Sequence, residues 1–158
     1  MLLTQRAFAA SIDRVRRALG GVPARIQVAA LPWRRTAKGV EVLLITSRDT
    51  GRWVLPKGWP EAGETRWQAA LREAGEEAGV VGTMSEQEIG CYLYGKNLKS
   101  GLEQRCEVHV FPLQVERVES KWPEKGQRAR KWFAPQIGAS RVREPELAEI
   151  LSGFHPAG

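Results

Sequence analysis

The sequence contains few of the groups that build disulfides or zinc sites. Its 158 residues include two cysteines, Cys91 and Cys106, and two histidines, His109 and His155. None of these residues has the spacing of a zinc site, and so few cysteines are typical of a reducing compartment. We therefore expect two buried thiols, no zinc and a cytoplasmic protein.

Long apolar runs are also missing. No stretch approaches the roughly 20 apolar residues that a membrane-spanning helix needs, so we expect no membrane segment. Residues 1–21 combine four arginines with apolar side chains at helical spacing, and they lack the continuous apolar centre of a secretory signal. This pattern favours an amphipathic helix packed on the domain, with an organelle presequence as the alternative.

The composition is that of an ordinary globular protein, with 42% hydrophobic and 27% charged residues. A chain of this length fits one domain, which we expect to span residues 1–158. The net charge of +6 predicts a surface that attracts anions, and nucleic acid, polyphosphate and an anionic membrane surface all fit this charge.

Strand and helix patterns are mixed along the chain. Residues 24–33 and 40–46 have the pattern of a β-hairpin, and further strands are predicted at 53–55, 89–94 and 106–118. Helices are predicted at about 66–78 and at 145–151. This alternation indicates an α/β layered domain.

The helix predicted at 66–78 carries three glutamates on one face. Thr65 and Gln68 form a capping box before it, and Gly79 suits the left-handed position after it. At about 100° per residue, Glu73, Glu76 and Glu77 lie opposite the apolar face of this helix. These carboxylates repel one another unless a cation neutralises them, and their hard oxygen atoms suit Mg²⁺, with Mn²⁺ as a possible substitute.

The segment from Gly58 to Val80 resembles the Nudix box, G-x5-E-x7-R-E-U-x-E-E-x-G-U, at every fixed position. The weakest match is Ala74, because the motif has a larger aliphatic residue at this position. The resemblance implies the Nudix fold, a mixed β-sheet sandwiched between α-helices, and the box at residues 58–80. It also implies a hydrolase that cleaves phosphorus-containing acid anhydrides.

The same resemblance implies roles for the residues of the box. Glu73 and Glu77 would be metal ligands with the Gly58 carbonyl, and Glu76 would be a ligand or the base that accepts a proton from the attacking water. Arg72 would orient the carboxylates of the box, and Glu64 would hold its loop. These five residues and Gly58 form the predicted catalytic and metal site.

The flanking segments 52–58 and 121–133 resemble those of diphosphoinositol polyphosphate phosphohydrolases and diadenosine polyphosphate hydrolases. Lys57 and Trp59 depart from the inositol enzymes, which favours the dinucleoside polyphosphates. The downstream proline associated with ADP-ribose hydrolases is missing. Candidate phosphate-binding residues, chosen because cationic side chains pair with phosphate, are Arg52, Lys57, Arg105, Arg128 and Arg130.

These features predict a Mg²⁺-dependent pyrophosphohydrolase with a small-molecule polyphosphate substrate. Two alternatives remain open. The high pI of about 9.7 also suits a protein that trims RNA 5′ ends or binds nucleic acid, although the sequence contains no nucleic-acid-binding motif. A regulator that binds a nucleotide without hydrolysing it is the other alternative.

Overall fold

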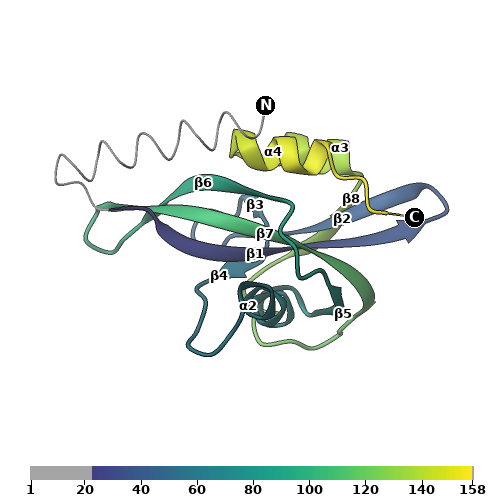
Figure 1. Ribbon diagram of the computed structural model, residues 1–158, viewed down its shortest axis with the longest axis horizontal. Helices are drawn as coiled ribbons and strands as arrows, with labels where there is room; N and C mark the ends of the chain where they lie inside the picture. Colours follow the sequence, from purple (N-terminus) through teal and green to yellow (C-terminus); the bar gives the residue numbers. More distant parts are fainter. Residues whose placement is uncertain (1–22, 158) are drawn as a thin grey trace.

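The centre of the protein is one mixed β-sheet of eight strands, seen in a computed structural model that describes residues 23–157 (Figure 1). Strands β1 (Arg25–Thr36) and β2 (Gly39–Thr46) form the predicted antiparallel hairpin, and β1 runs parallel to β7 (Glu103–Val118). The other strands are β3 (Trp53–Val54), β4 (Lys57–Gly58), β5 (Val80–Met84), β6 (Gly90–Asn97) and β8 (Arg130–Phe133).

Short strands extend the central order β3-β2-β1-β7-β5. Strand β4 pairs with β1, β6 pairs with β7, and β8 pairs with β2. The pairing of β4 with β1 places Gly58 opposite Val28, so the start of the box is fixed to the central strand.

Helices cover both faces of the sheet (Figure 1). Helix α2 (Arg66–Glu73) and the π-helical turn η1 (Ala74–Ala78) lie on one face, and α3 (Pro135–Arg141) and α4 (Pro145–Ser152) lie on the other. The predicted mixed sheet between helices is therefore confirmed.

Two cores result from the alternation of side chains along the strands. In β1, Val28 and Ala30 pack in the cluster that includes the α2 side chains, while Ala29 and Leu31 pack in the cluster that includes Leu147 of α4. Because successive side chains of a strand point to opposite faces, one strand supplies both layers.

The box helix differs from the regular α-helix that its sequence predicts. The capping box of Thr65 and Gln68 is present, and Gly79 ends the helix with a φ of 63°. Between them the α-helix stops at Glu73, and residues 74–78 form a π-helical turn. The wider turn changes the angular positions of Glu76 and Glu77, so the prediction of one regular helix over 66–78 is wrong in its last five residues.

Two predictions about other segments have different outcomes. The amphipathic helix predicted at 1–21 lies outside the described residues. Within residues 23–157, no helix is long and apolar enough to span a bilayer.

Candidate active site

Strand β4 and the box helix meet at Gly58. A Cβ atom at this position would collide with the carboxylate of Glu73, which reaches from the end of α2 to the strand. Burial raises the pKa of the Glu73 carboxyl, against the opposing effect of Arg72. Only glycine therefore leaves room for this partly desolvated carboxylate beside the backbone of β4.

Glu77 reaches the same strand from the π-helical turn. Its side chain is nearly buried, and its carboxylate accepts hydrogen bonds from the backbone N–H of Lys57 at 3.1 Å and from Arg128 Nη2 at 2.9 Å. Burial raises the pKa of Glu77 to about 7, although Arg128 and the Lys57 N–H both lower it. The structure thus brings Glu73 and Glu77 together at β4, as carboxylates that are costly to ionise without a nearby cation.

Arg72 connects the helix to the loop before it. Its guanidinium donates to Glu64 at 2.7 and 3.1 Å, to Glu73 at 2.9 Å and to the Trp59 carbonyl at 3.1 Å. The hydrogen bond from Arg72 is the main cause that lowers the pKa of the Glu64 carboxyl. Arg72 and Glu64 therefore have the geometry that the resemblance implies for them, an orienting cation and a loop anchor.

Glu76 stands apart from the other two glutamates of the helix. Its side chain is 46% exposed, and its carboxylate lies 3.6 Å from Arg72 Nη1. A solvent-accessible carboxylate beside a buried pair is placed to receive a proton from a water molecule.

The segment between β7 and β8 holds the C-terminal end of the π-helical turn. The backbone N–H groups of Glu119 and Glu124 donate to the carbonyls of residues 79 and 76 at 2.7 and 3.1 Å. Trp122 Nε1 donates to the residue 77 carbonyl at 3.2 Å, and Arg130 Nη1 donates to the residue 78 carbonyl at 2.8 Å. Four consecutive carbonyls that a helix end leaves unpaired are thus satisfied by one segment.

The two arginines predicted near the end of the chain are occupied by these contacts. Arg128 pairs with Glu77, contacts Glu124 at 3.3 Å and donates to the Thr46 carbonyl at 3.1 Å. Arg130 stacks on Trp122 at 3.8 Å and donates to backbone carbonyls. Phosphate binding by Arg128 and Arg130 stays a prediction, and the structure gives both a role in holding the box.

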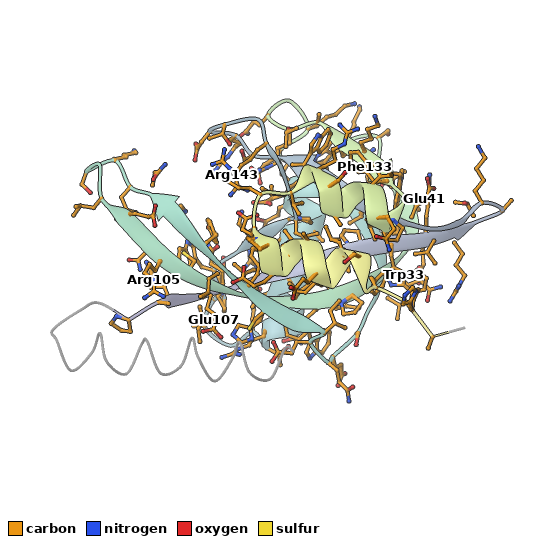
Figure 2. All side chains as sticks on the ribbon, turned by 90° about the horizontal axis from the view of Figure 1, so that it is seen from above. Trp33, Glu41, Arg105, Glu107, Phe133 and Arg143 are labelled. Atoms are coloured by element: carbon orange, nitrogen blue, oxygen red, sulfur yellow. The ribbon has the colours of Figure 1, made fainter. Side chains whose placement is uncertain are left out.

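The other predicted phosphate-binding residues divide between the two faces of the sheet. Arg52 forms an ion pair with Glu144 at 2.7 Å, and Lys57 lies near them on the α4 side, where burial lowers the pKa of its ammonium. Arg105 projects to the α2 side beside Glu107 (Figure 2), four residues along β7 from the position opposite Val28. Four residues of strand correspond to about 13 Å, so Arg105 lies at some distance from Gly58.

The donor set at β4 fits a hard divalent cation. Glu73, Glu77 and the Gly58 backbone supply only oxygen atoms, and the two carboxyls have raised pKa values that a cation would lower. Within residues 23–157, however, no three His, Cys, Asp or Glu side chains already converge on one metal position. The assignment of Gly58, Glu73, Glu76 and Glu77 as metal ligands therefore stays a prediction.

Two glutamates near the site escaped the sequence analysis. Glu124 lies between Arg128 and Arg48, and Glu144 is only 7% exposed against Arg52. Both lie more than 40 residues from the box helix; Glu124 falls within the flanking segment 121–133, and Glu144 belongs to no motif. Only their positions in the fold connect them to the site.

A second charged cluster lies at the start of α2. His109 Nδ1 is 2.5 Å from Glu88 and 3.4 Å from Arg66, and His109 Nε2 is 3.0 Å from Glu107. The 3.0 Å contact with Glu107 is the main cause that raises the pKa of the imidazole, and Glu88 adds to it against the effect of burial. The two carboxylates flank opposite nitrogens of the ring, so they favour its protonated form.

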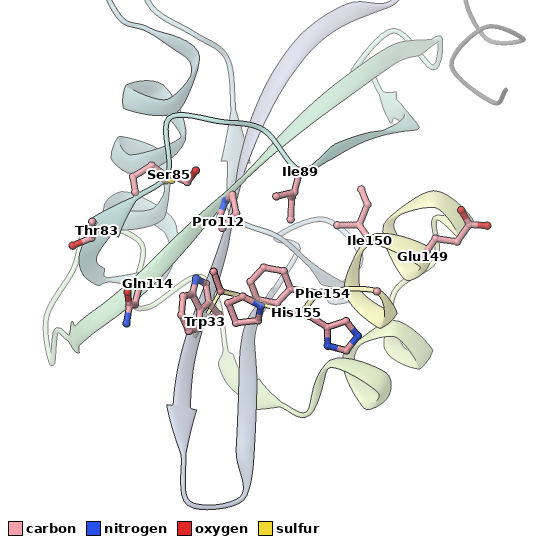
Figure 3. Close-up of a pocket in the computed structure, with 14 residues that line it drawn as sticks. Trp33, Thr83, Ser85, Ile89, Pro112, Gln114, Glu149, Ile150, Phe154 and His155 are labelled. Carbon is pink, nitrogen blue, oxygen red and sulfur yellow. The ribbon is translucent and has the colours of Figure 1, made fainter. Parts of the chain in front are cut away.

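One cavity among the described residues lies away from the box. It has a volume of about 560 Å³ and lies between the end of α4, the β5–β6 loop and β1 (Figure 3). Its walls include Trp33, Ile89, Pro112 and Phe154, and none of its lining residues is a lysine or arginine. A polyphosphate would find no cationic partner in this cavity, so we do not assign the active site to it.

Comparison with known proteins agrees with the fold. The NUDIX domain model matches residues 23–152, and this chain belongs to the Nudix family. It is 34% identical over 131 residues to "Nudix hydrolase 21, chloroplastic" of Arabidopsis thaliana, covering 80% of this chain and 64% of that protein. It is 32% identical over 129 residues to "Diphosphoinositol polyphosphate phosphohydrolase 3-beta" of Bos taurus, covering 78% and 74%.

A solved structure supports the fold. A C. elegans Ap4A hydrolase in a binary complex superposes with a TM-score of 0.61 at 23% identity, covering 82% of this chain and 93% of that one. The chain spans less than two thirds of the length of three Arabidopsis relatives, at 64%, 58% and 59%. The family is therefore shown, while the substrate has to be inferred from the site.

Proposed function

We propose that this protein is a Mg²⁺-dependent hydrolase that cleaves a phosphoanhydride bond in a diadenosine polyphosphate or a diphosphoinositol polyphosphate. The observation that carries the proposal is the pair of desolvated carboxylates, Glu73 at Gly58 and Glu77 at the Lys57 N–H, which meet at β4. Two such groups have raised pKa values, and binding a divalent cation offsets that cost. Mn²⁺ would be a substitute with the same oxygen preference.

The residues of the box have separate roles in this reaction. Glu73, Glu77 and the Gly58 carbonyl would hold the cation, which neutralises phosphate charge and lowers the pKa of a bound water. Arg72 fixes Glu73 in place through its hydrogen bond, and its bonds to Glu64 fix the loop. The protein thus supplies a preorganised set of charges, which is the main requirement for phosphoryl transfer.

Glu76 would take the proton from the attacking water. The water oxygen forms a bond to phosphorus while the bridging P–O bond breaks, and the bridging oxygen leaves on the second phosphate with the bonding electron pair. The released proton passes to the Glu76 carboxylate and then to solvent, which its 46% exposed side chain permits.

The choice of substrate class rests on likeness and on charge. Relatives named for diphosphoinositol polyphosphates and structures titled Ap4A hydrolase both resemble this chain. Both substrates carry more phosphate groups, and so more negative charge, than a compound with only one phosphoanhydride bond. A highly charged anion suits a protein with a net charge of +6.

The test is a phosphate-release screen with magnesium. The substrates are diadenosine polyphosphates, inositol pyrophosphates, nucleoside triphosphates, ADP-ribose and 5′-triphosphate RNA. We expect the first two classes to have the highest kcat/KM. Highest activity on RNA would favour the 5′-end alternative, and tight nucleotide binding without turnover would favour a regulator.

A matched pair of variants tests the site itself. Glu77→Gln keeps the side-chain shape but removes a charge from the proposed metal site, so we expect kcat to fall by more than about a hundredfold, because a few kcal/mol of charge stabilisation is lost. Glu86→Gln changes an exposed glutamate of the β5–β6 loop and should retain full activity. Chelation with EDTA should abolish wild-type turnover. Retained turnover in Glu77→Gln at saturating magnesium would show that the metal assignment is wrong.

A further inference from the structure

The arginines around the box already have partners inside the protein. Arg72 and Arg128 pair with box glutamates, Arg52 pairs with Glu144, and Arg130 donates to backbone carbonyls. Binding a phosphate with any of these would compete with an existing contact. The cations available to a substrate must therefore lie elsewhere.

Three other cations lie on the α4 face of the sheet, opposite the face that the box helix covers: Arg25 of β1, Lys57 of β4 and Lys96 of β6. Lys57 is opposite Ala29, whose side chain faces α4, and Arg25 is on the same face because it is four residues away along β1. Arg25 pairs with Cys106, which pairs with Tyr94, and Lys96 follows two residues later on the same face. We call these three residues the basic tract.

Aromatic rings hold the basic tract in place. The Arg25 guanidinium lies 4.1 Å from the centre of the Trp59 ring and Lys96 Nζ lies 5.4 Å from it, while Lys57 Nζ lies 4.9 Å from the Tyr94 ring. Tyr94 is itself fixed by a 2.7 Å hydrogen bond from its hydroxyl to Gln27. A ring can orient a cation without neutralising it, so the charges of Arg25 and Lys96 stay available, whereas burial lowers the pKa of the Lys57 ammonium.

No ion pair between residues 23 and 157 involves any of the three cations. All three cations act on the Cys106 thiol. Burial raises the pKa of this thiol, and the positive charges of Lys96, Lys57 and Arg25 lower it. The side chain of the neighbouring acid Glu103 packs against Gly95. Gly95 follows Tyr94 in β6, so Glu103 lies on the face of the sheet opposite Tyr94. The tract is therefore a local excess of positive charge.

We propose that the basic tract binds phosphate groups that lie beyond the anhydride being cleaved. Lys57 precedes Gly58 in the chain, and Arg25 is three residues along β1 from the position opposite Gly58, or about 10 Å away. The tract therefore runs outward from the metal site. A substrate with only two phosphates cannot contact both ends of it, whereas one with four or more can.

This inference rests on the proposed function and narrows it. Contacts with phosphates remote from the attacked bond exist in the ground state and in the transition state, so they act on KM and leave kcat nearly unchanged. The tract thus makes the protein a selector of long or highly phosphorylated substrates. It also occupies Trp59 with cations, which disfavours a role for this ring as a stacking surface for a base.

The first test compares two double variants across substrates of different length. Arg25→Ala/Lys96→Ala removes the outer part of the tract. Arg34→Ala/Lys38→Ala is the matched control, since Arg34 lies 4.1 Å over the Trp132 ring and both residues are at the hairpin end of β1. Initial rates at saturating magnesium give kcat and KM for diadenosine pentaphosphate and diadenosine triphosphate.

We expect the tract variant to raise KM for the pentaphosphate by about tenfold or more, because charge-assisted hydrogen bonds to phosphate are lost. KM for the triphosphate should change by less than about threefold. The control variant should leave both values unchanged, and Arg25→Lys should keep most of the affinity. Equal changes for both substrates, or equal changes in the control, would overturn the proposal.

A binding measurement separates failure of the tract from failure of the proposed function. Calorimetric titration with inorganic tripolyphosphate, without metal, should show binding to the wild type and the control and about tenfold weaker binding to the tract variant. One outcome is that the wild type hydrolyses neither polyphosphate class while the tract variant still binds tripolyphosphate more weakly. In that case the proposed function is wrong and phosphate binding by the basic tract is confirmed. If all three proteins bind tripolyphosphate equally, the tract is wrong whatever the enzyme cleaves.

Discussion

Arg128 offers the sharpest test of how the site is held together. Sequence reasoning assigns its guanidinium to the substrate, whereas in the structure it pairs with Glu77 at 2.9 Å. The Arg128 side chain is 7% exposed and that of Glu77 is 11% exposed, so the pair is buried. Arg128→Met keeps apolar volume but leaves the Glu77 carboxylate without its cation.

The expected cost follows from this burial. Removing one partner of a buried ion pair typically destabilises a protein by about 3–5 kcal/mol. For a chain of this size each kcal/mol lowers Tm by about 2–4 °C, so Tm should fall by roughly 6–20 °C. The matched control is Arg48→Met, because Arg48 contacts Glu124 at 3.4 Å but is 56% exposed. Its loss should cost less than about 1 kcal/mol.

The cost should also depend on pH. Glu77 has a pKa of about 7 in the folded protein against an ordinary value of 4.5, so the folded state holds more protons between these values. The free energy of unfolding therefore decreases as pH rises through this window. Arg128 lowers the pKa of Glu77, so the loss of unfolding free energy in Arg128→Met should be small near pH 5 and should grow towards pH 8.

Urea denaturation of both variants and the wild type, in EDTA and at several pH values, measures these quantities. Kinetics at saturating magnesium complete the comparison. If Arg128→Met unfolds within about 1 kcal/mol of the wild type and raises KM about tenfold, then Arg128 binds phosphate and the structural assignment is refuted.

Three further predictions concern the surroundings of the site. Gly58→Ala should raise the magnesium concentration needed for half-maximal rate by about tenfold or more, because the new Cβ displaces the Glu73 carboxylate; unchanged magnesium dependence would contradict this. Trp122→Phe removes one N–H donor from the end of η1 and should cost about 1 kcal/mol by urea denaturation, with a cost near zero showing that water replaces the bond. For His109, the contact with Glu107 raises the imidazole pKa, so the stabilisation from this contact is complete below pH 6.5 and is lost as pH rises through the folded pKa. His109→Gln should remove that part of the pH dependence of unfolding, and an unaltered profile would show that the imidazolium is not stabilising.

Local sequence patterns determined much of the box. The capping box of Thr65 and Gln68, the end at Gly79 and the spacing of the glutamates are all contained within 23 consecutive residues. Such signals depend on contacts between near neighbours, so one sequence is enough to read them. The same is true of the β1–β2 hairpin, whose alternating strands flank a short polar turn.

The π-helical turn was not readable from the sequence, because it depends on what holds the far end of the helix. The carbonyls of η1 receive hydrogen bonds from Trp122 and Arg130, more than 40 residues away. Short β4, β5 and β8 escaped prediction for a related reason, since they exist through pairing with longer strands rather than through their own composition.

The tertiary structure alone decided which cations are occupied and which are available. From the sequence, Arg128 is chosen as a phosphate-binding candidate and Lys96 is not. The fold buries Arg128 against Glu77 and places Lys96 over Trp59, where no carboxylate of the described chain pairs with it. A charge acts through its distance to other charges and through its desolvation, and both depend on strand register and layer packing that no local pattern encodes.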